Sequence, residues 1–200
     1  MLKKENHQWH TDSLANVASD AVGVSSRKWF IAIVNTNTEI SSRERLLSEG
    51  YEARVASQFE THLWRNGRRY KSEHILIPLT LFVHATEEER REIISYPFIK
   101  KFMTDKAQVA NNYGVHPFAV VPDHEMDMLQ FMLYQSDTAV KFSSRPIRQG
   151  SKIRVVRGSL RGFEGHITRY HDNDAYAVAN IGILGCAMVK ISLCDIESLT

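Results

Sequence analysis

Four glycines that fall within sixteen residues constrain the C-terminal part of this chain more than any other feature. They flank a short segment in which Ile153 and Val155 would lie on one face of a strand and Arg154 and Val156 on the other. Glycine permits a positive φ or a close backbone approach at a turn or bulge. The spacing therefore predicts a strand, a tight turn and a returning strand within a sharply curled small β-structure.

The same residues resemble the KOW motif of transcription elongation factors and some ribosomal proteins. That motif usually carries an acid and a proline at the positions where this chain has Ser151 and Ser159. The resemblance implies a small all-β SH3-like KOW barrel over residues 149–200. The residues that match the motif are Gly150, Gly158, Arg161, Gly162 and Gly165.

Length, composition and charge bound the class of protein. Two hundred residues, 43% of them hydrophobic and 24% charged, are enough for one domain or two small ones with ordinary cores. Residues 139–200 carry nine Lys and Arg against five Asp and Glu, and this basic balance favours a nucleic-acid or acidic partner as much as a solvated basic face. Apolar runs are too short to span a bilayer, and no secretory signal precedes them. With only two cysteines, we expect a cytoplasmic protein that has reduced thiols and no membrane partner.

The pattern along the chain predicts an α+β organisation in four parts. Residues 1–26 are polar and are expected to form a mobile extension. Residues 27–138 are expected to form an α/β sandwich, an antiparallel sheet with helices packed on it. Residues 139–148 have the composition of a linker, and residues 149–200 form the predicted barrel.

Local signals place the elements within residues 27–138. Asn66 and Gly67 predict a type I′ hairpin turn, and Thr86 and Glu89 form the capping box of a short helix. Asp123 is expected to cap a last helix that has Met126, Leu129 and Leu133 on one face. The other predicted elements are strands at 27–34, 51–59 and 75–83, a strand or extended segment at 106–112, and a helix at 39–49.

This order of elements resembles the NusG family of transcription elongation factors, from about Arg27 to the C-terminus. The segment K-W-F-I-A at residues 28–32 is similar to the opening W-Y-V-V strand of the family. Residues 76–83 lie where the family has F-P-G-Y-V-F-V, and residues 122–126, P-D-H-E-M, are similar to its I-P-D-x-E-I helix start. The long N-terminus, with Ile77, Leu79 and Thr80 as departures from the family pattern, most resembles the UpxY-type antiterminators of capsular polysaccharide operons.

Membership would imply a monomer whose N-terminal domain binds the clamp helices of RNA polymerase. A bound factor of this family suppresses pausing and termination, and nascent RNA or non-template DNA is a further expected partner. The KOW domain would recruit a ribosomal protein or a termination factor. Two alternatives stay open: an RNA-binding or ribosome-associated KOW module, and a NusG-like factor that promotes termination.

Motif position selects two groups of candidate residues. An exposed apolar patch on the sheet is expected to bind polymerase, although the same residues also fit plain core packing. Cationic side chains on the hairpin are expected to contact nucleic-acid phosphate, although they also fit a merely soluble strand edge. The polymerase-binding candidates are Phe30, Ile77, Pro78 and Leu79, and the nucleic-acid candidates are Arg65, Arg68, Arg69 and Lys71.

No catalytic or metal-binding signature accompanies these surfaces. The nine histidines are scattered, and His7 and His10 have no further ligand nearby. Nucleophile-elbow, P-loop and dinucleotide patterns are absent from the sequence. We therefore expect a protein that is not an enzyme and that uses no metal or cofactor.

Overall fold

A computed structural model describes residues 26–145, 147, 150–170 and 174–199. The predicted N-terminal extension therefore lies outside the described residues, apart from Ser26. The described chain contains three α-helices and antiparallel sheets, which confirms a mixed α/β architecture.

A five-stranded antiparallel sheet forms the centre of the N-terminal part. Strand β1 (Lys28–Val34) lies between β5 (Thr80–Ala85) on one side and β6 (Ile99–Phe102) and β7 (Val120–Val121) on the other. The short β2 (Glu52–Arg54) pairs with the other edge of β5. Consecutive residues of β1 are buried on both faces of the sheet, which explains why this strand reads as a continuous apolar run.

Two helices cover one face of this sheet. Helix α1 (Glu39–Ser48) contributes Leu46, and helix α2 (Glu87–Ile93) contributes Ile93, to a core shared with β1 and β5. The predicted capping box of α2 is confirmed, because Thr86 Oγ1 accepts from Glu89 N at 3.2 Å and Glu89 Oε2 accepts from Thr86 N at 2.8 Å.

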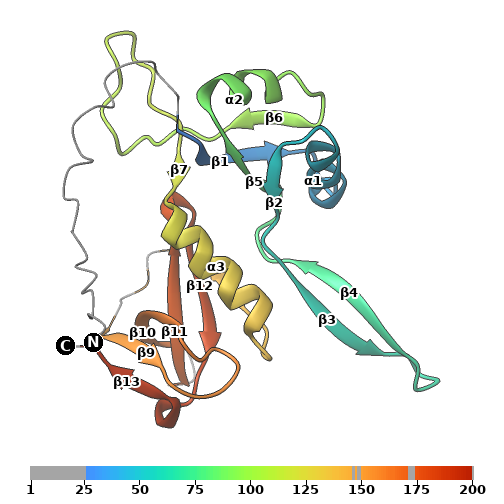
Figure 1. Ribbon diagram of the computed structural model, residues 1–200, viewed down its shortest axis with the longest axis vertical. Coiled ribbons are helices and arrows are strands. Elements are labelled where there is room, and N and C mark those ends of the chain that lie inside the picture. The colour runs from blue at the N-terminus through green and yellow to red at the C-terminus, as the bar shows by residue number, and fades with distance from the viewer. Residues whose placement is uncertain (1–25, 146, 148–149, 171–173, 200) are drawn as a thin grey trace, which may run out of the picture.

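Helix α3 (Asp123–Gln135) lies on the opposite face and separates the first sheet from a second one (Figure 1). The predicted inward residues Met126, Leu129 and Leu133 are buried. They belong to a core cluster that combines Ile31 of β1 with Ala177 of the second sheet. A single helix therefore joins the hydrophobic cores of the N-terminal and C-terminal parts.

The second sheet has six antiparallel strands in the order β13-β9-β10-β11-β12-β8. The glycine-rich strand, turn and strand are present as β9 and β10, which pair with each other. Strand β8 lies inside the segment predicted as a linker, and it extends the sheet by pairing with β12. Among the described residues β13 and β8 do not pair, so no closed barrel is found. The strands are β8 (Lys141–Ser143), β9 (Lys152–Val155), β10 (Glu164–Tyr170), β11 (Asp174–Ile181), β12 (Gly185–Lys190) and β13 (Ile196–Ser198), with 3₁₀ turns η1 (Gly182–Leu184) and η2 (Leu193–Asp195).

A separate two-stranded ribbon, β3 (Ser57–Leu63) and β4 (Arg69–Ile75), extends away from both sheets (Figure 1). The type I′ turn predicted at its tip is wrong, because Gly67 has a positive φ but Asn66 does not. Gly67 N donates to Trp64 O, and Trp64 N donates to Arg68 O, which gives a three-residue loop closed by a glycine in the left-handed region.

Two other strand predictions fail for local reasons. The predicted strand at 75–83 is interrupted at residues 76–79, because Pro78 has no N–H to donate and Leu79 adopts a φ of +61°. Residues 106–112 form a loop with exposed side chains such as Val109, because the segment turns back on itself through Asn111.

Candidate functional site

The β4–β5 loop holds an apolar side chain in an unfavourable backbone conformation. Leu79 has a φ of +61°, a region that a leucine rarely adopts. Two backbone hydrogen bonds hold it there: Leu79 N donates to Glu39 Oε1 at 2.7 Å, and Val34 N donates to Leu79 O at 3.0 Å. The side chain is nevertheless 36% exposed. Strain of this kind, held by surrounding contacts, is concentrated at functional sites in proteins.

The candidate polymerase-binding residues divide by burial. Pro78 and Leu79 are exposed, whereas Phe30 and Ile77 are both 5% exposed and lie in the core. Phe30 packs edge-on against Phe102 on the α1/α2 side of the sheet, and Ile77 belongs to the cluster around α3. The structure therefore leaves Pro78 and Leu79 as the part of the predicted apolar patch that a partner can reach.

A buried carboxylate holds the β4–β5 loop in place. Glu39, at the start of α1, is only 3% exposed, and its Oε2 has no hydrogen-bond partner among the described residues. Its other oxygen is the acceptor for Leu79 N. A helix N-terminus favours a negative charge, so α1 helps to place the carboxylate that fixes the loop.

The base of the β3–β4 ribbon is anchored to helix α1 and to the segment that follows α3. Glu73 Oε1 accepts from Arg43 Nη1 of α1 at 3.0 Å and from Ser57 Oγ. Gln58 Nε2 donates to Thr138 O at 3.1 Å, just after α3, and Gln58 Oε1 accepts from Val140 N at 3.0 Å. These contacts fix the direction of the ribbon, while its far half has no helix over it (Figure 1).

The tip of the ribbon carries positive charge only. Residues 62–71 contain four Lys and Arg and no Asp or Glu. All four candidate cations are exposed, and no ion pair with another described residue involves them. The ribbon thus brings together the nucleic-acid candidates Arg65, Arg68, Arg69 and Lys71.

Sequence reasoning missed a group of rings on the same ribbon. The ring centroids of His62 and Tyr70 lie 5.1 Å apart in a stacked arrangement, and those of Trp64 and Tyr70 lie 5.1 Å apart at 43°. Trp64 is 59% exposed and Tyr70 is 41% exposed. His62 is the cross-strand partner of Tyr70, and Trp64 follows two residues later, just after β3; this spacing is the sequence signal that identifies the shared face.

The glycines of the KOW-like motif serve two different structural purposes. Gly162 has a φ of +94° in the turn between β9 and β10. Gly165 has no such requirement, but a Cβ there would lie 2.6 Å from the Phe163 ring and 2.7 Å from Val178 O. Gly158 is of the first kind and Gly150 of the second, while Arg161 is exposed in the turn.

Contacts across α3 connect it to the second sheet. Glu125 Oε2 accepts from Gly182 N at 2.5 Å, at the turn between β11 and β12. Phe131 stacks on Phe163 with ring centroids 6.5 Å apart. This face of α3 is therefore covered, and it is not available to another protein in this arrangement.

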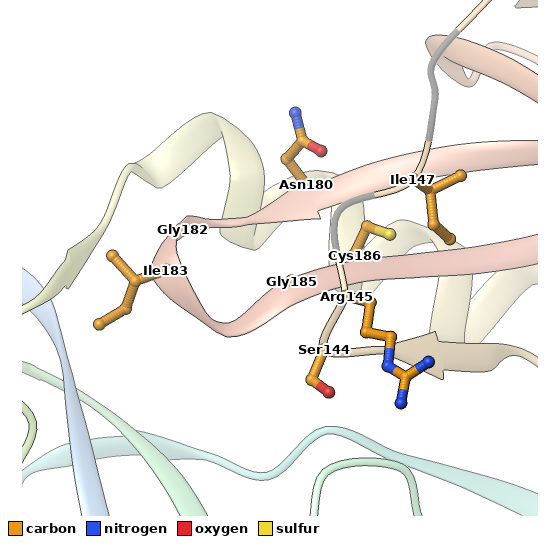
Figure 2. Close-up of a pocket in the computed structure, with 8 residues that line it drawn as sticks. All are labelled: Ser144, Arg145, Ile147, Asn180, Gly182, Ile183, Gly185 and Cys186. Atoms are coloured by element: carbon orange, nitrogen blue, oxygen red, sulfur yellow. The ribbon is translucent and has the colours of Figure 1, made fainter. Parts of the chain in front are cut away.

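A hollow lies beside the same turn on the second sheet (Figure 2). Its lining includes Arg145 and Ile147, from the segment after β8, and Asn180 and Cys186, from β11 and β12. A Cβ at Gly185 would lie 2.1 Å from Ser143 O, so β8 passes β12 too closely for residue 185 to carry a side chain. Burial raises the pKa of the Cys186 thiol, which keeps it protonated.

Charged groups in helix α2 are arranged for structural support. Arg90 is 6% exposed, its guanidinium carbon lies 3.7 Å from the centroid of the Phe118 ring, and Arg90 Nη2 donates to Glu87 Oε1 at 2.6 Å. The hydrogen bonds from Arg90 lower the pKa of Glu87 despite partial burial.

Across the described ranges, no group of three His, Cys, Asp or Glu side chains is placed to hold a metal ion. No helix of those ranges is long and apolar enough to cross a membrane.

Comparison with known proteins gives structural neighbours only. No protein-family model matches the sequence, and no curated protein matches it. A structure of NusG from Thermotoga maritima, solved to describe its domain interaction, is 15% identical, with a TM-score of 0.44 over 89% of this chain and 100% of that one. Spt5-containing MjSpt4:Spt5 complexes in conformations A and B are 9% and 10% identical, with TM-scores of 0.26 and 0.24 over 86% of this chain and 98% and 97% of theirs. A functional assignment therefore depends on this chain's own residues.

Proposed function

We propose that this chain is a transcription elongation regulator of the NusG type, which binds RNA polymerase and promotes read-through of one specific operon for polysaccharide biosynthesis. It acts in the cytoplasm by binding and without catalysis. The second sheet serves as its KOW-type domain for a further protein partner. The UpxY-type antiterminators are the branch that its sequence resembles.

The observation that carries the proposal is the exposed, strained Leu79. A leucine with φ of +61° is maintained by two hydrogen bonds while its side chain faces solvent. A glycine would relieve the strain, and the NusG family, which this chain resembles, has a small residue at this position. The retention of an apolar side chain there supports a role in docking a partner.

Packing elsewhere restricts where polymerase is able to dock. The face of α3 is covered by the second sheet, and Phe30 and Ile77 are in the core. Pro78 and Leu79 are the exposed candidates, close to the base of the basic ribbon through β4. A factor docked through this loop would extend the ribbon toward nucleic acid that polymerase holds.

The proposal is tested by binding of the full chain to purified core RNA polymerase. Leu79→Asn removes the apolar side chain and suits a positive φ, so the fold is preserved. Burial of a leucine contributes about 1.5–3 kcal/mol, so we expect binding to weaken by about tenfold or more. Ile94→Asn is the matched control, because Ile94 has a similar exposure of 39% at the C-cap of α2. Equal binding by the wild type and a folded Leu79→Asn variant would exclude the loop from the interface.

The regulatory part is tested by transcript profiles after deletion of the gene. Read-through of one operon predicts a loss of its distal transcripts while promoter-proximal transcripts stay nearly unchanged. Equal loss of both would indicate action at initiation, and increased read-through across the genome would indicate a termination factor. Co-sedimentation with ribosomes instead of polymerase would favour the alternative of a ribosome-associated module.

A further inference from the structure

The rings on the β3–β4 ribbon form a stack that ends in solvent. Tyr70 lies between His62 and Trp64, at 5.1 Å from each ring centroid. Trp64 is thus the terminal ring, next to the three-residue loop, and is 59% exposed. No cation of the described residues lies over Trp64 or Tyr70, in contrast to Trp29, which Arg54 covers at 4.8 Å. Trp64 therefore offers exposed ring surface to another flat ring.

Cations surround this open ring. Arg65 follows Trp64 directly, and Arg68 is opposite to it across the loop through the hydrogen bond between Trp64 N and Arg68 O. Both arginines are exposed and have no ion pair with a described residue. The combination of an open aromatic face with unpaired cations matches a ligand that carries flat rings and phosphates.

We propose that the ribbon tip binds single-stranded nucleic acid, with one base stacked on Trp64 and the adjoining phosphates held by Arg65 and Arg68. This inference rests on the proposed function for its setting and adds the class of ligand and the contact residue. Duplex is disfavoured because its bases are already stacked and paired, so no base face is available to Trp64. Tyr70 and His62 act as positioning residues, since they hold the tryptophan at the end of the stack.

The two faces of the ribbon differ, which provides a matched control. Leu63 and Phe59 lie on the face opposite to the rings, as cross-strand partners of Arg69 and Glu73. Leu63 is 68% exposed and Phe59 is 64% exposed, so these side chains are at least as accessible as Trp64. Loss of affinity caused by general apolar adhesion would affect both faces equally, whereas base stacking would depend on the ring face alone.

The test measures binding of the full chain to a short fluorescein-labelled oligonucleotide by fluorescence anisotropy. Three probes of one sequence are compared: single-stranded RNA, single-stranded DNA and the DNA duplex. We expect a single strand to bind at least about tenfold more tightly than duplex. We expect Trp64→Ala to weaken single-strand binding by about tenfold, Trp64→Phe to restore most of the affinity, and Leu63→Ala to change it less than about twofold.

The salt dependence separates the phosphate contacts from the stacking. Each phosphate contact contributes about −0.7 to the slope of log K against log salt for a single strand. Arg65→Ala and Arg68→Ala together should reduce that slope by about 1.4, whereas Trp64→Ala should leave it unchanged. A Trp64→Ala variant that loses slope, or arginine variants that do not, would contradict the assigned division of roles.

Failure of this inference is distinguishable from failure of the proposed function. If the wild type binds polymerase but shows no preference for single strands, or if Leu63→Ala weakens binding as much as Trp64→Ala, the inference is wrong and the function stands. If single strands bind through Trp64 but polymerase does not bind, the proposed function is wrong and the inference stands. The RNA and DNA arms show which kind of strand the tip prefers.

Discussion

Helix α3 and the β3–β4 ribbon are adjacent along the molecule but have opposite environments. Met126, Leu129 and Met132 of α3 are fully buried between two sheets. Phe59, Leu63 and Trp64 of the ribbon are each more than half exposed. Both elements contain large apolar side chains, so hydrophobicity alone does not separate structural residues from candidate binding residues. Burial by both sheets makes α3 a structural joint, whereas the exposed ribbon is a candidate binding element.

The largest expected effect is a loss of stability on truncation within α3. Leu129→Ala removes a fully buried side chain and should lower the free energy of unfolding by about 2–5 kcal/mol. Leu63→Ala in the ribbon should lower it by less than about 0.5 kcal/mol. Urea denaturation of the two variants makes the comparison. Similar losses for both would show that the ribbon is part of a cooperative core.

A second loss of stability is expected in the turn between β9 and β10, which packs against α3 through Phe163 and Phe131. Gly162→Val places a β-branched residue at φ +94° and should destabilise the protein by about 1–3 kcal/mol. Thermal unfolding measures the change, with Ser159→Val in the same turn as the exposed control. A neutral Gly162→Val substitution would mean that the turn adopts another conformation in solution.

A smaller effect is expected at the contact between α3 and the second sheet. Glu125→Gln keeps the shape of the side chain but replaces the charged oxygen that accepts from Gly182 N by a neutral amide group. This change should lower the free energy of unfolding by about 1 kcal/mol. Hydrogen exchange should become faster at the Gly182 amide and stay unchanged at the ribbon. Unchanged exchange at Gly182 would show that this hydrogen bond does not contribute to the joint.

The smallest expected effect is a loss of stability at low pH, caused by the ion pair between Glu87 and Arg90 in helix α2. Because Arg90 lowers the pKa of Glu87, this pair contributes stability that is present above the pKa of an unfolded glutamate and is lost as pH falls through the lower folded value. Glu87 is partly exposed, with 35% of its side chain accessible, so the contribution is below about 1 kcal/mol. Denaturation of wild type and Glu87→Gln should converge at low pH. A constant difference between them across the pH range would contradict the assignment to this ion pair.

The parts of the fold that depend on local pattern were predictable from the sequence. The buried face of α3, the capping box of Thr86 and Glu89 and the glycine positions of β9 and β10 follow from periodicity, capping and turn chemistry. Strand β8 was not predictable, because its pairing with β12 is long-range and its three residues have no strand signature of their own. The positive φ of Leu79 was also hidden, since nothing in the local sequence requires a leucine to adopt it, although the adjacent Pro78 does signal a break in the strand.

The candidate sites were predictable only in part, for a related reason. The basic residues at the ribbon tip are visible as a charge cluster, and the structure does bring them together. Burial of Phe30 was not predictable because β1 is apolar on both faces, and burial of Ile77 depends on how the β4–β5 loop packs against the core around α3. Prediction of the ring stack would have required the pairing register of β3 and β4. The wrong turn type gave a different register.

Hydrogen–deuterium exchange of the chain, alone and on a reconstituted elongation complex, tests the difference between α3 and the exposed elements most directly. We predict that binding slows exchange at Leu79 and at the ribbon tip, residues 62–71, while Leu129 and Met132 remain as protected as in the free protein. Unchanged exchange at both Leu79 and the tip, with the chain demonstrably bound to polymerase, would contradict the account.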